Sequence, residues 1–464
     1  MDAQSPFSPL RIVIVPWLGF GHLLPCLELA ERLAERGHHV TYVSTPRNLA
    51  RLPPLRPATT PGVNLVAVPL PRVDGLPDGA ESTNDVPGDD RELHWKAFDG
   101  LAAPFAEFLA AACANKATRP HWIIADSFHH WAAASALEQQ VPCAMLLPSA
   151  AMLVSLFKPS AAPVPRHEQE TASAITNPGA SGMSIFQRFT LTIERCTVGA
   201  IRSCVEWEPE MFPIAVAIFG KPLMPLGLLP PSPVGGRRAA GSEEHTTVRW
   251  LDAQPSKSVV YVALGSEVPL SVEQVHELAL GLELAETRFL WVLRKPSGVT
   301  VLDDDDDGSD MLPPGFQKRM HALALVTTGW VPQMSILAHA SVGGFLTHCG
   351  RGSLVEGLLF GCPLVLLPIF GDQGPNARQM ELNKVGLQVA REEKDGSFDR
   401  HGIASAVQAV LVDGEARRGF VVGAAKMNEV VADNELHDRY IDEFIRQLRS
   451  YAAGSGATAA PDSS

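Results

Sequence analysis

The sequence predicts an α/β protein made of two doubly wound halves, each a parallel sheet covered by helices. In the first half, an apolar run at 10–16, a helical pattern and a second run at 39–44 form a βαβ unit. The second half repeats this alternation of apolar runs and helical stretches. A chain of 464 residues also exceeds one ordinary core, so we expect two domains of roughly 200 residues each.

The first βαβ unit begins with a short run of branched apolar residues at 10–16. Such a continuous run is typical of a strand that is buried on both faces. A glycine-bearing loop follows at 17–22, and a helix is then expected to end at Gly37. Its apolar stripe consists of Leu23, Leu27, Ala30 and Ala34.

The second half contains a similar series of elements. Buried strands are expected at 258–265, 288–294, 325–330, 344–348 and 363–369. Helices are expected between most of them, at 272–284, 352–360 and 374–385. Two doubly wound halves that face each other follow from this pattern, and such sheets bind ligands beyond the carboxyl ends of their strands.

The domain borders follow from local composition. A run rich in proline and glycine predicts an interdomain linker at 231–245, between a first domain at 1–230 and a second at 246–433. Asp433 can cap a final helix at 434–451, in which apolar residues recur at steps of four. The small, polar residues at 452–464 predict a disordered tail.

Composition narrows the class of protein and its location. A net charge of −13 argues against a nucleic-acid surface, because phosphate binding needs basic patches. Seven cysteines without metal-ligand spacing predict neither disulfides nor a metal site. The N-terminus lacks a signal layout, and the longest apolar run, at 358–370, is interrupted by Gly361, Pro363 and Pro368. We therefore expect no membrane insertion, and a monomer in the cytoplasm.

The segment at 330–373 holds the side chains that a uridine diphosphate sugar requires. An aromatic residue offers a flat surface to the base, and a carboxylate accepts from the ribose hydroxyls. Diphosphate favours the N–H groups and dipole of a helix N-terminus, which the turn at 348–353 provides. The candidate donor-binding residues are Ser266, Trp330, Val331, Gln333, His348, Gly350, Gly352, Ser353, Glu356, Asp372 and Gln373.

This segment resembles the nucleotide-sugar signature of plant family 1 UDP-dependent glycosyltransferases, and the resemblance covers most of the chain. It implies a GT-B fold, in which two facing Rossmann-like domains leave a cleft between them, and a last helix that returns to the first domain. It also implies that Asp372 and Gln373 bind the sugar, with glucose favoured by the Gln. A helix cap at Asp372, for a helix that starts near Gly374, is the alternative, and both roles can coexist.

One dipeptide departs from the family pattern. Arg351 and Gly352 follow His-Cys-Gly, where the family usually has Trp-Asn, so one phosphate contact is missing. The backbone N–H of Gly352 is still available. Arg351 either helps to bind the diphosphate or a charged sugar, or points into solvent.

Two residues of the first domain form the candidate catalytic pair. His22 follows the glycine loop and is suited to take a proton from an acceptor hydroxyl near neutral pH. Asp126 follows an apolar strand and can fix the imidazole tautomer. Both match the family's catalytic positions. Direct displacement then inverts the anomeric centre. No metal is required because the helix N-terminus and His348 stabilise the UDP leaving group, and UDP-glucose is a co-substrate, so no cofactor is expected.

The acceptor is indicated mainly by resemblance. The motifs at 16–22, 126–131 and 367–378 look like the branch-forming subgroup, and most like steviol glycoside β-1,2-glucosyltransferases. They imply transfer of glucose to the sugar of a diterpenoid or flavonoid glycoside. Transfer to an aglycone, another UDP-sugar, and a non-catalytic sugar-nucleotide-binding protein are the alternatives. Candidates for an apolar acceptor wall, which core packing explains equally well, are Trp17, Phe20, Trp95, Phe128 and Phe370.

Overall fold

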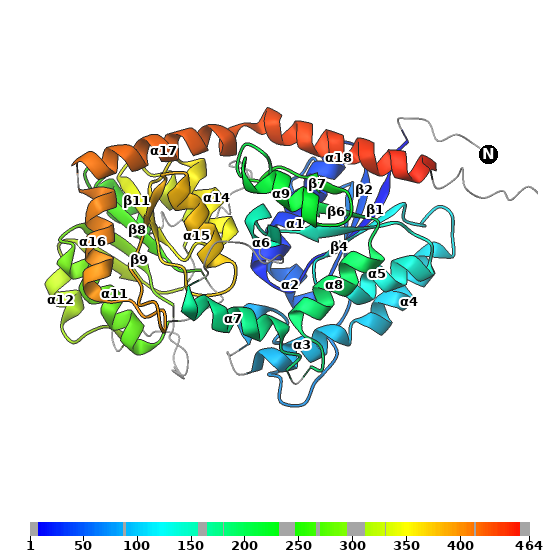
Figure 1. Cartoon of the computed structure of the whole chain (residues 1–464), viewed down its shortest axis with the longest axis horizontal. Helices are drawn as coiled ribbons and strands as arrows, with labels where there is room; N and C mark the ends of the chain where they lie inside the picture. Colours follow the sequence, from blue (N-terminus) through cyan, green and yellow to red (C-terminus); the bar gives the residue numbers. More distant parts are fainter. Residues whose placement is uncertain are drawn as a thin grey trace, which may run out of the picture. The chain divides into compact units, whose positions relative to one another are not determined.

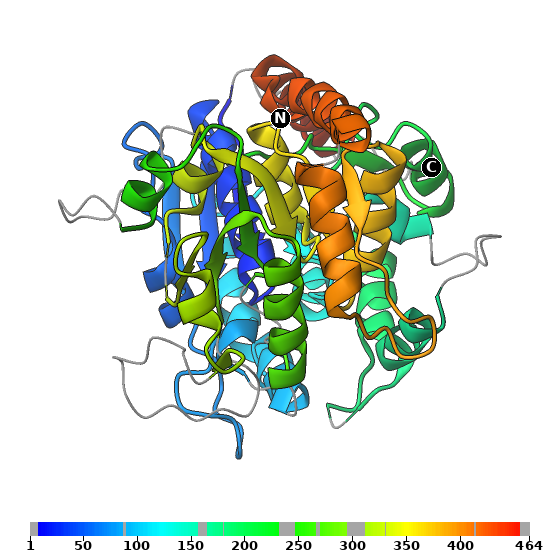
Figure 2. The ribbon, with the colours of Figure 1, turned by 90° about the vertical axis from the view of Figure 1, so that its left-hand side faces the viewer.

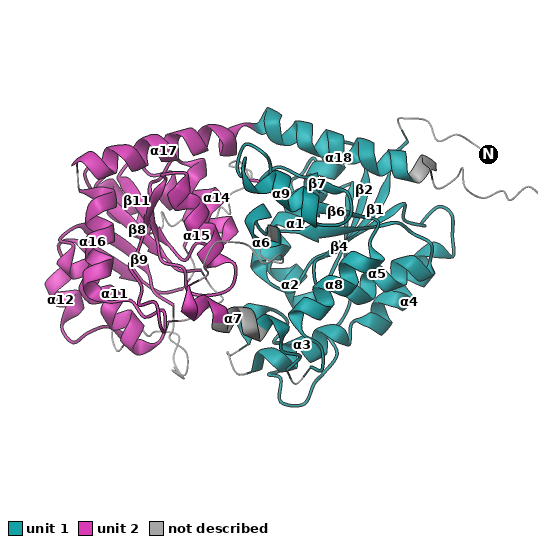
Figure 3. Cartoon of the chain, in the orientation of Figure 1, with its two compact units in different colours: residues 1–158, 175–229, 434–464 teal, residues 159–174, 230–433 magenta. Residues whose placement is uncertain are grey.

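The computed structural model describes residues 8–86, 90–155, 165–179, 181–231, 246–265, 270–294, 311–329, 331–412 and 414–454. The chain splits into two compact units, which Figure 3 shows in different colours. Unit 1 comprises Met1–Lys158, Ile175–Leu229 and Asn434–Ser464, and unit 2 comprises Pro159–Ala174 and Pro230–Asp433. Each unit is an α/β body with a parallel sheet, so the predicted fold class is confirmed.

Unit 1 contains a seven-stranded sheet with the order β3-β2-β1-β4-β5-β6-β7 (Figure 1). All of its strand pairs are parallel. The chain order changes direction between β1 and β4, and ligands of doubly wound sheets bind at such a switch point. The strands are β1 Arg11–Val15, β2 His39–Ser44, β3 Val63–Ala67, β4 Trp122–Asp126, β5 Cys143–Leu147, β6 Val198–Ile201 and β7 Leu223–Pro225.

Helices cover both faces of this sheet. On one face, α1 and the final helix α18 bury an apolar cluster that includes Ile12, Leu27 and Phe444. On the other face, α4, α5 and α8 pack over the opposite side chains of the same strands. The helices of unit 1 are α1 Phe20–Glu35, α2 Pro46–Arg51, α3 Arg91–Asp99, α4 Ala102–Cys113, α5 His130–Glu138, α6 Ala151–Ser155, α8 Ile185–Arg195, α9 Met211–Ile218 and α18 Asn434–Gly454, with a 3-10 turn at Thr83–Asp85. Between α6 and α8 in sequence lies α7 Arg166–Thr176, most of which belongs to unit 2.

The final helix is held to unit 1 by polar contacts as well as apolar packing. Trp122 donates from its indole Nε1 to the carbonyl of Leu448 over 3.0 Å. Arg36, at the end of α1, pairs with Asp438 at 2.8 Å. Because Trp122 starts β4, the helix is tied directly to a central strand of the sheet.

Unit 2 contains a six-stranded parallel sheet with the order β10-β9-β8-β11-β12-β13. Its strands are β8 Val259–Ala263, β9 Arg288–Val292, β10 Ala324–Thr327, β11 Val342–Thr347, β12 Leu364–Leu366 and β13 Gly386–Gln388. Helices α11 and α16 cover one face and run side by side in Figure 2. The helices are α10 Thr246–Asp252, α11 Val272–Leu284, α12 Phe316–Met320, α13 Gln333–Leu337, α14 Arg351–Leu359, α15 Gln373–Leu382, α16 Arg400–Leu411 and α17 Gly414–Ala432.

Residues 159–174 belong to unit 2, although they lie within the stretch 1–230 that the sequence assigned to the first domain. The physical reason is visible at the start of α7. Glu168 forms a bidentate ion pair with Arg378 on α15, with N–O distances of 2.7 and 3.0 Å. The backbone N–H of His167 also donates to the carbonyl of Glu393. The predicted linker, apart from residue 231, and the predicted tail beyond residue 454 lie outside the described residues.

Candidate active site

His22 and Asp126 meet at the carboxyl edge of the first sheet. Asp126 is the last residue of β4, and His22 lies in the first turn of α1, just after β1. Strands β1 and β4 are neighbours with Val15 paired to Ala125, so the residues that follow them emerge side by side. The imidazole Nδ1 lies 2.8 Å from Asp126 Oδ2, with the His22 side chain 25% exposed and the Asp126 side chain fully buried.

The surroundings of Asp126 favour its ionised form. Its Oδ1 accepts from the Ser127 N–H at 2.6 Å and from the Ser127 hydroxyl at 2.9 Å, and its Oδ2 also accepts from the Trp17 N–H. Burial by itself raises the pKa of Asp126, but the charge and hydrogen bond of His22 and the hydrogen bond from the Trp17 N–H bring that pKa below its ordinary value. Because a carboxylate only accepts, Nδ1 of His22 donates, and the neutral ring has its lone pair on Nε2.

Three of the five aromatic residues that the sequence suggested for an acceptor wall lie together beside His22. Trp17 and Trp95 stack with ring centroids 4.0 Å apart, and Phe128 contacts both edge-on at 5.5 and 5.4 Å. The Phe128 ring lies 6.1 Å from the His22 ring. Phe20 instead packs against the core on the opposite face of the sheet, and Phe370 belongs to unit 2.

A buried arginine supports this aromatic group from behind. The guanidinium carbon of Arg188 on α8 lies 4.6 Å from the centre of the Trp95 ring, within the range of a cation–π interaction. Arg188 is 1% exposed and forms an ion pair with Asp99 at the end of α3. The same carboxylate lies 3.5 Å from Nε2 of His130. Trp95 is thus held between Trp17 and Arg188.

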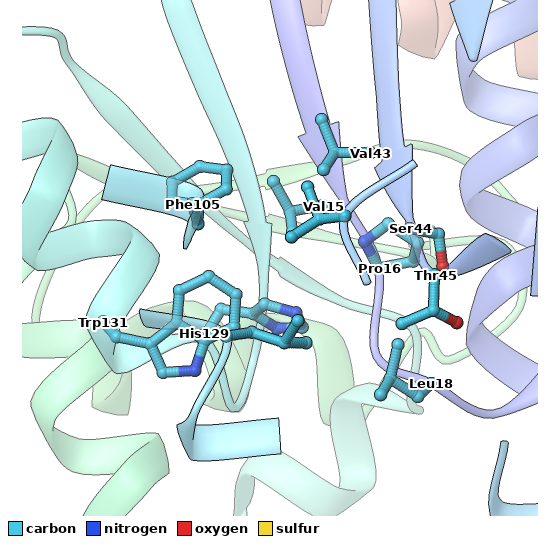
Figure 4. Close-up of a pocket in the computed structure, with 11 residues that line it drawn as sticks. Val15, Pro16, Leu18, Val43, Ser44, Thr45, Phe105, His129 and Trp131 are labelled. Carbon is cyan, nitrogen blue, oxygen red and sulfur yellow. The ribbon is translucent and has the colours of Figure 1, made fainter. Parts of the chain in front are cut away.

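His129 is a packing residue rather than a second exposed base. It is 1% exposed, and burial lowers its pKa to about 4, so the ring is neutral near pH 7. Its ring meets Phe98 edge-on at 4.8 Å. His129 also lines a small cavity, together with Trp131 and residues that follow β1 and β2 (Figure 4). The cavity volume is about 20 Å³, which is room for roughly one water molecule.

In unit 2, Gln333 and Glu356 are joined in one hydrogen-bonded chain. The Gln333 side-chain amide donates to the Glu356 carboxylate, and the Gln333 carbonyl accepts from the hydroxyl of Tyr261 at 3.0 Å. Tyr261 stacks on Phe345 with centroids 5.2 Å apart. Burial and the nearby Glu356 charge raise the pKa of Tyr261, so its hydroxyl stays protonated and donates. These hydrogen bonds fix the side-chain orientations of Gln333 and Glu356, the two candidate ribose ligands.

Two glycines leave room for the imidazole of His348. A Cβ on Gly265 would lie 2.7 Å from this ring, and a Cβ on Gly350 would overlap its Nε2. Gly265 also has a left-handed φ of +75°, which favours glycine. Burial lowers the pKa of His348 to about 4, so the neutral ring has one N–H to donate.

The turn after β11 leads directly into helix α14. Cys349 adopts a left-handed φ of +66°, and Gly350 precedes the first helical residue, Arg351. The N–H groups of Gly352 and Ser353 therefore lie in the first helical turn, where backbone donors favour an anion. Arg351 is only 6% exposed, so the alternative that its side chain points into solvent is wrong.

Asp372 and Gln373 end the β12 connection and begin α15. The Gln373 carbonyl oxygen accepts from the Ile369 N–H at 2.8 Å and the Phe370 N–H at 3.1 Å, which fixes the side-chain amide. Asp372 stands at the N-cap position but makes no capping hydrogen bond there. Its Oδ2 instead accepts from the side chain of Asn376 at 3.2 Å, so the helix-cap alternative is wrong.

The remaining donor candidates are placed as follows. Ser266 and Trp330 lie outside the described residues. Val331 is 8% exposed, and its carbonyl accepts from the Gln333 N–H at 2.9 Å. The other eight all belong to unit 2. Gln333 begins α13, His348 and Gly350 lie in the turn between β11 and α14, Gly352, Ser353 and Glu356 lie on α14, and Asp372 and Gln373 stand at the start of α15.

Sequence reasoning missed three residues that support these groups, namely Tyr261, Arg188 and Asn376. Tyr261 and Arg188 act through side-chain contacts with partners 72 and 89 residues away. Asn376 has one partner four residues away and one 27 residues away. Only the contact between Asn376 and Asp372 could have been predicted from the sequence, because side chains four residues apart are neighbours on a helix. The other two pairings depend on strand order.

No helix in the described part of the chain combines the length and apolar character needed to cross a membrane.

The fold and these groups define a class. Two doubly wound α/β units, with a His–Asp pair in one and a helix N-terminus flanked by the candidate ribose and sugar ligands in the other, are typical of enzymes that transfer a sugar from a nucleotide. Residues 211–419 match the family model described as UDP-glucoronosyl and UDP-glucosyl transferase.

Similar proteins extend this match over the whole chain. UDP-glycosyltransferase 91C1 of Arabidopsis thaliana is 35% identical over 97% of this chain and 98% of its own length. UDP-glycosyltransferase 91D2 of Stevia rebaudiana is 36% identical over 95% of this chain and 94% of its own. The crystal structure of Arabidopsis thaliana UGT89C1 complexed with UDP-L-rhamnose, 26% identical, covers 95% of this chain and all of its own with a TM-score of 0.76.

The chain belongs to the plant UDP-glycosyltransferase family, and its fold is GT-B. It is a glycosyltransferase whose co-substrate is a UDP-sugar and whose second substrate is a small molecule. Enzymes of this family require no metal.

Proposed function

We propose that this enzyme transfers glucose from UDP-glucose to a sugar hydroxyl of a diterpenoid or flavonoid glycoside, forming a β-1,2 linkage with inversion. The observation that carries the proposal is the 2.8 Å hydrogen bond between His22 Nδ1 and the buried Asp126 carboxylate. This bond leaves the lone pair of the neutral ring on Nε2, the atom suited to take a proton from a hydroxyl.

The proposed reaction is a single displacement. The acceptor hydroxyl gives its proton to Nε2 of His22 while its oxygen forms a bond to the anomeric carbon of the donor. The bond from that carbon to the diphosphate oxygen breaks, and UDP leaves with the electron pair. Asp126 is ionised and stabilises the imidazolium that forms. Attack opposite the leaving group converts an α-linked donor into a β-glycoside.

The donor-binding roles are assigned by the chemistry of each group. The Glu356 carboxylate, oriented by Gln333, accepts from the ribose hydroxyls. His348 and the N–H groups of Gly352 and Ser353 donate to the diphosphate. Asp372 and the side-chain amide of Gln373 bind the glucose hydroxyls. Trp330 is proposed to stack on the uracil, beside Val331, and Ser266 to add a phosphate contact.

UDP-L-rhamnose is the second candidate donor. The solved UGT89C1 structure holds that sugar nucleotide, and the Arg351-Gly352 pair departs from the family's usual residues. Arg351 is buried and is the first residue of α14. The departure from the family's residues therefore lies next to the proposed diphosphate ligands, which supports testing a donor other than UDP-glucose.

For the acceptor, the aromatic group beside His22 supports an apolar aglycone. Trp95 and Phe128 are only partly buried, and both lie in contact with Trp17. A glycoside would place its ring system against these aromatic side chains and its sugar hydroxyl at His22. Within the same proposal the enzyme acts as a monomer in the cytoplasm, which light scattering and a fluorescent fusion would test.

The deciding experiment offers UDP-glucose and UDP-L-rhamnose separately, each with steviol, steviol monoglucoside and a flavonoid monoglucoside in competition. One added hexose on a glucoside, detected by mass spectrometry and assigned by NMR as β-1,2, is the expected result. Product on the free aglycone alone would overturn the branch-forming assignment. Thermal stabilisation by UDP-glucose without product from any acceptor would favour a non-catalytic binding protein.

A further inference from the structure

Asn376 connects two parts of the candidate donor site that are distant in sequence. It lies in the first turn of α15 and is 2% exposed. Its Nδ2 donates to the carbonyl of Cys349 at 3.1 Å and to Oδ2 of Asp372 at 3.2 Å. One amide nitrogen, with two hydrogens, therefore bridges the turn after β11 and the carboxylate before α15.

The turn that Asn376 contacts is a strained one. Cys349 has a φ of +66°, a conformation that non-glycine residues rarely adopt and that persists where the surroundings hold it. The Cys349 thiol contacts the Thr347 carbonyl within the same turn, whereas the Cys349 carbonyl is bonded by Asn376, 27 residues away. The orientation of this turn thus depends on α15.

The amide orientation of Asn376 is unambiguous. Exchanging its nitrogen and oxygen would place the oxygen against two acceptors, a carbonyl and a carboxylate. Its Oδ1 has no hydrogen-bond partner among the residues that the structure describes.

We propose that Asn376 is a positioning residue that locks the diphosphate-binding turn at 348–350 to the sugar-binding carboxylate of Asp372. The donor then meets its phosphate and sugar ligands in one fixed geometry. Asn376 does not touch the donor and acts through Cys349 and Asp372. This inference rests on the proposed donor-binding roles of those two parts of the site.

The test is a double-mutant cycle read with two ligands, UDP and UDP-glucose, by calorimetry. Asp372→Ala should weaken UDP-glucose and leave UDP unchanged, because UDP has no sugar. Asn376→Ala should weaken UDP about threefold, through the turn, and UDP-glucose about tenfold, through both contacts. In the Asp372→Ala background, Asn376→Ala should weaken UDP-glucose only about threefold.

Asn428→Ala is the matched control. The Asn428 side chain also donates to two carbonyls of unit 2, those of Leu358 and Leu359, at the other end of α14. Its loss should lower the melting temperature and leave both affinities unchanged. Should Asn376→Ala fold poorly, Asn376→Asp keeps the shape, places a carboxylate against Asp372, and should weaken UDP-glucose by more than tenfold.

The inference is overturned if Asn376→Ala leaves UDP-glucose affinity unchanged, or if its tenfold loss persists in the Asp372→Ala background. In both cases the wild-type enzyme still binds UDP-glucose, so the proposed donor stands. A wild-type enzyme that does not bind UDP-glucose would instead overturn the donor assignment and this inference together.

Discussion

Nδ1 of His22 lies 2.8 Å from Oδ2 of Asp126, although 104 residues separate them in sequence. The pairing of β1 with β4 brings them together, since Asp126 is the last residue of β4 and His22 lies in the first turn of the helix that follows β1. The carboxylate is buried and its pKa is held below the ordinary value. The imidazole therefore has a fixed tautomer before any substrate binds.

His22→Ala should remove the general base and lower kcat by roughly two to four orders of magnitude. UDP-glucose affinity should stay within about twofold of wild type, because the proposed donor ligands belong to unit 2. Steady-state kinetics and calorimetry would check both values. Turnover close to that of the wild type would remove His22 as the base.

Asp126→Asn tests the electrostatics of the pair through stability. The folded-state pKa of Asp126 lies below its ordinary value of 3.8, so its stabilising contribution is present above that pH. The contribution is lost as pH falls through the folded-state pKa. Urea-unfolding midpoints between pH 6 and pH 3 should therefore fall more steeply in the wild type than in the variant. Parallel curves would contradict a depressed pKa.

Tyr261→Phe should raise the KM for UDP-glucose about threefold to tenfold, because Gln333 loses the hydroxyl that orients it. The kcat should be unchanged if Gln333 and Glu356 bind donor and transition state equally. Tyr42→Phe is a suitable control, since it removes a buried tyrosine hydrogen bond to Leu23 in unit 1. A KM that changes equally in both variants would argue against a role for the hydrogen bonds that link Tyr261, Gln333 and Glu356.

Gly350→Ala and Gly352→Ala differ in the space available for the new methyl group. At Gly350 it would overlap His348, whereas at Gly352 nothing lies within 4 Å. Gly350→Ala should weaken UDP binding by roughly tenfold, and Gly352→Ala should leave it nearly unchanged. Equal affinities would show that the position of His348 is unimportant for the diphosphate.

Gly352→Asn restores the family residue at an open position and should strengthen UDP-glucose binding about threefold, by one added hydrogen bond to phosphate. The preference between UDP-glucose and UDP-L-rhamnose should be measured in the same variant. An unaltered affinity and preference would make the departure at this position neutral.

Arg188→Met removes the cation over Trp95 and leaves Asp99 without its main partner. We expect a KM for the acceptor raised at least about threefold and a KM for UDP-glucose unchanged, since Arg188 lies behind the aromatic group of unit 1. Arg195→Met, on the same helix and bonded to the His130 carbonyl, is the control. Reduced donor affinity would indicate a general loss of folding instead.

The strands and the helices after them were predictable from the sequence because buried parallel strands are continuous apolar runs. The prediction at 39–44 coincides with β2 and the one at 272–284 with α11. His22 and Asp126 were predicted to interact because both follow such runs and match the family motif. The pairing of β1 with β4 that makes this possible was visible only in the structure.

Contacts between distant polar side chains were not predictable, because they depend on strand order and register. Arg188 lies on α8 and Asp99 on α3, 89 residues apart. The sequence around either residue gives no indication that the other is its partner. The same holds for Glu168 and Arg378, which assign residues 159–174 to unit 2. The alternative cap at Asp372 is wrong, since Asp372 makes no capping hydrogen bond at the start of α15 and its carboxylate accepts from Asn376 instead.

The return of α18 to unit 1 has a consequence for biosynthesis. A ribosome makes the chain from its N-terminus, and domains generally fold as they emerge. All of unit 2 has been synthesised by Asp433, whereas unit 1 lacks the residues from Asn434 onward at that moment. The half whose synthesis begins first is therefore completed last, because its final helix is made only after the whole sequence of unit 2.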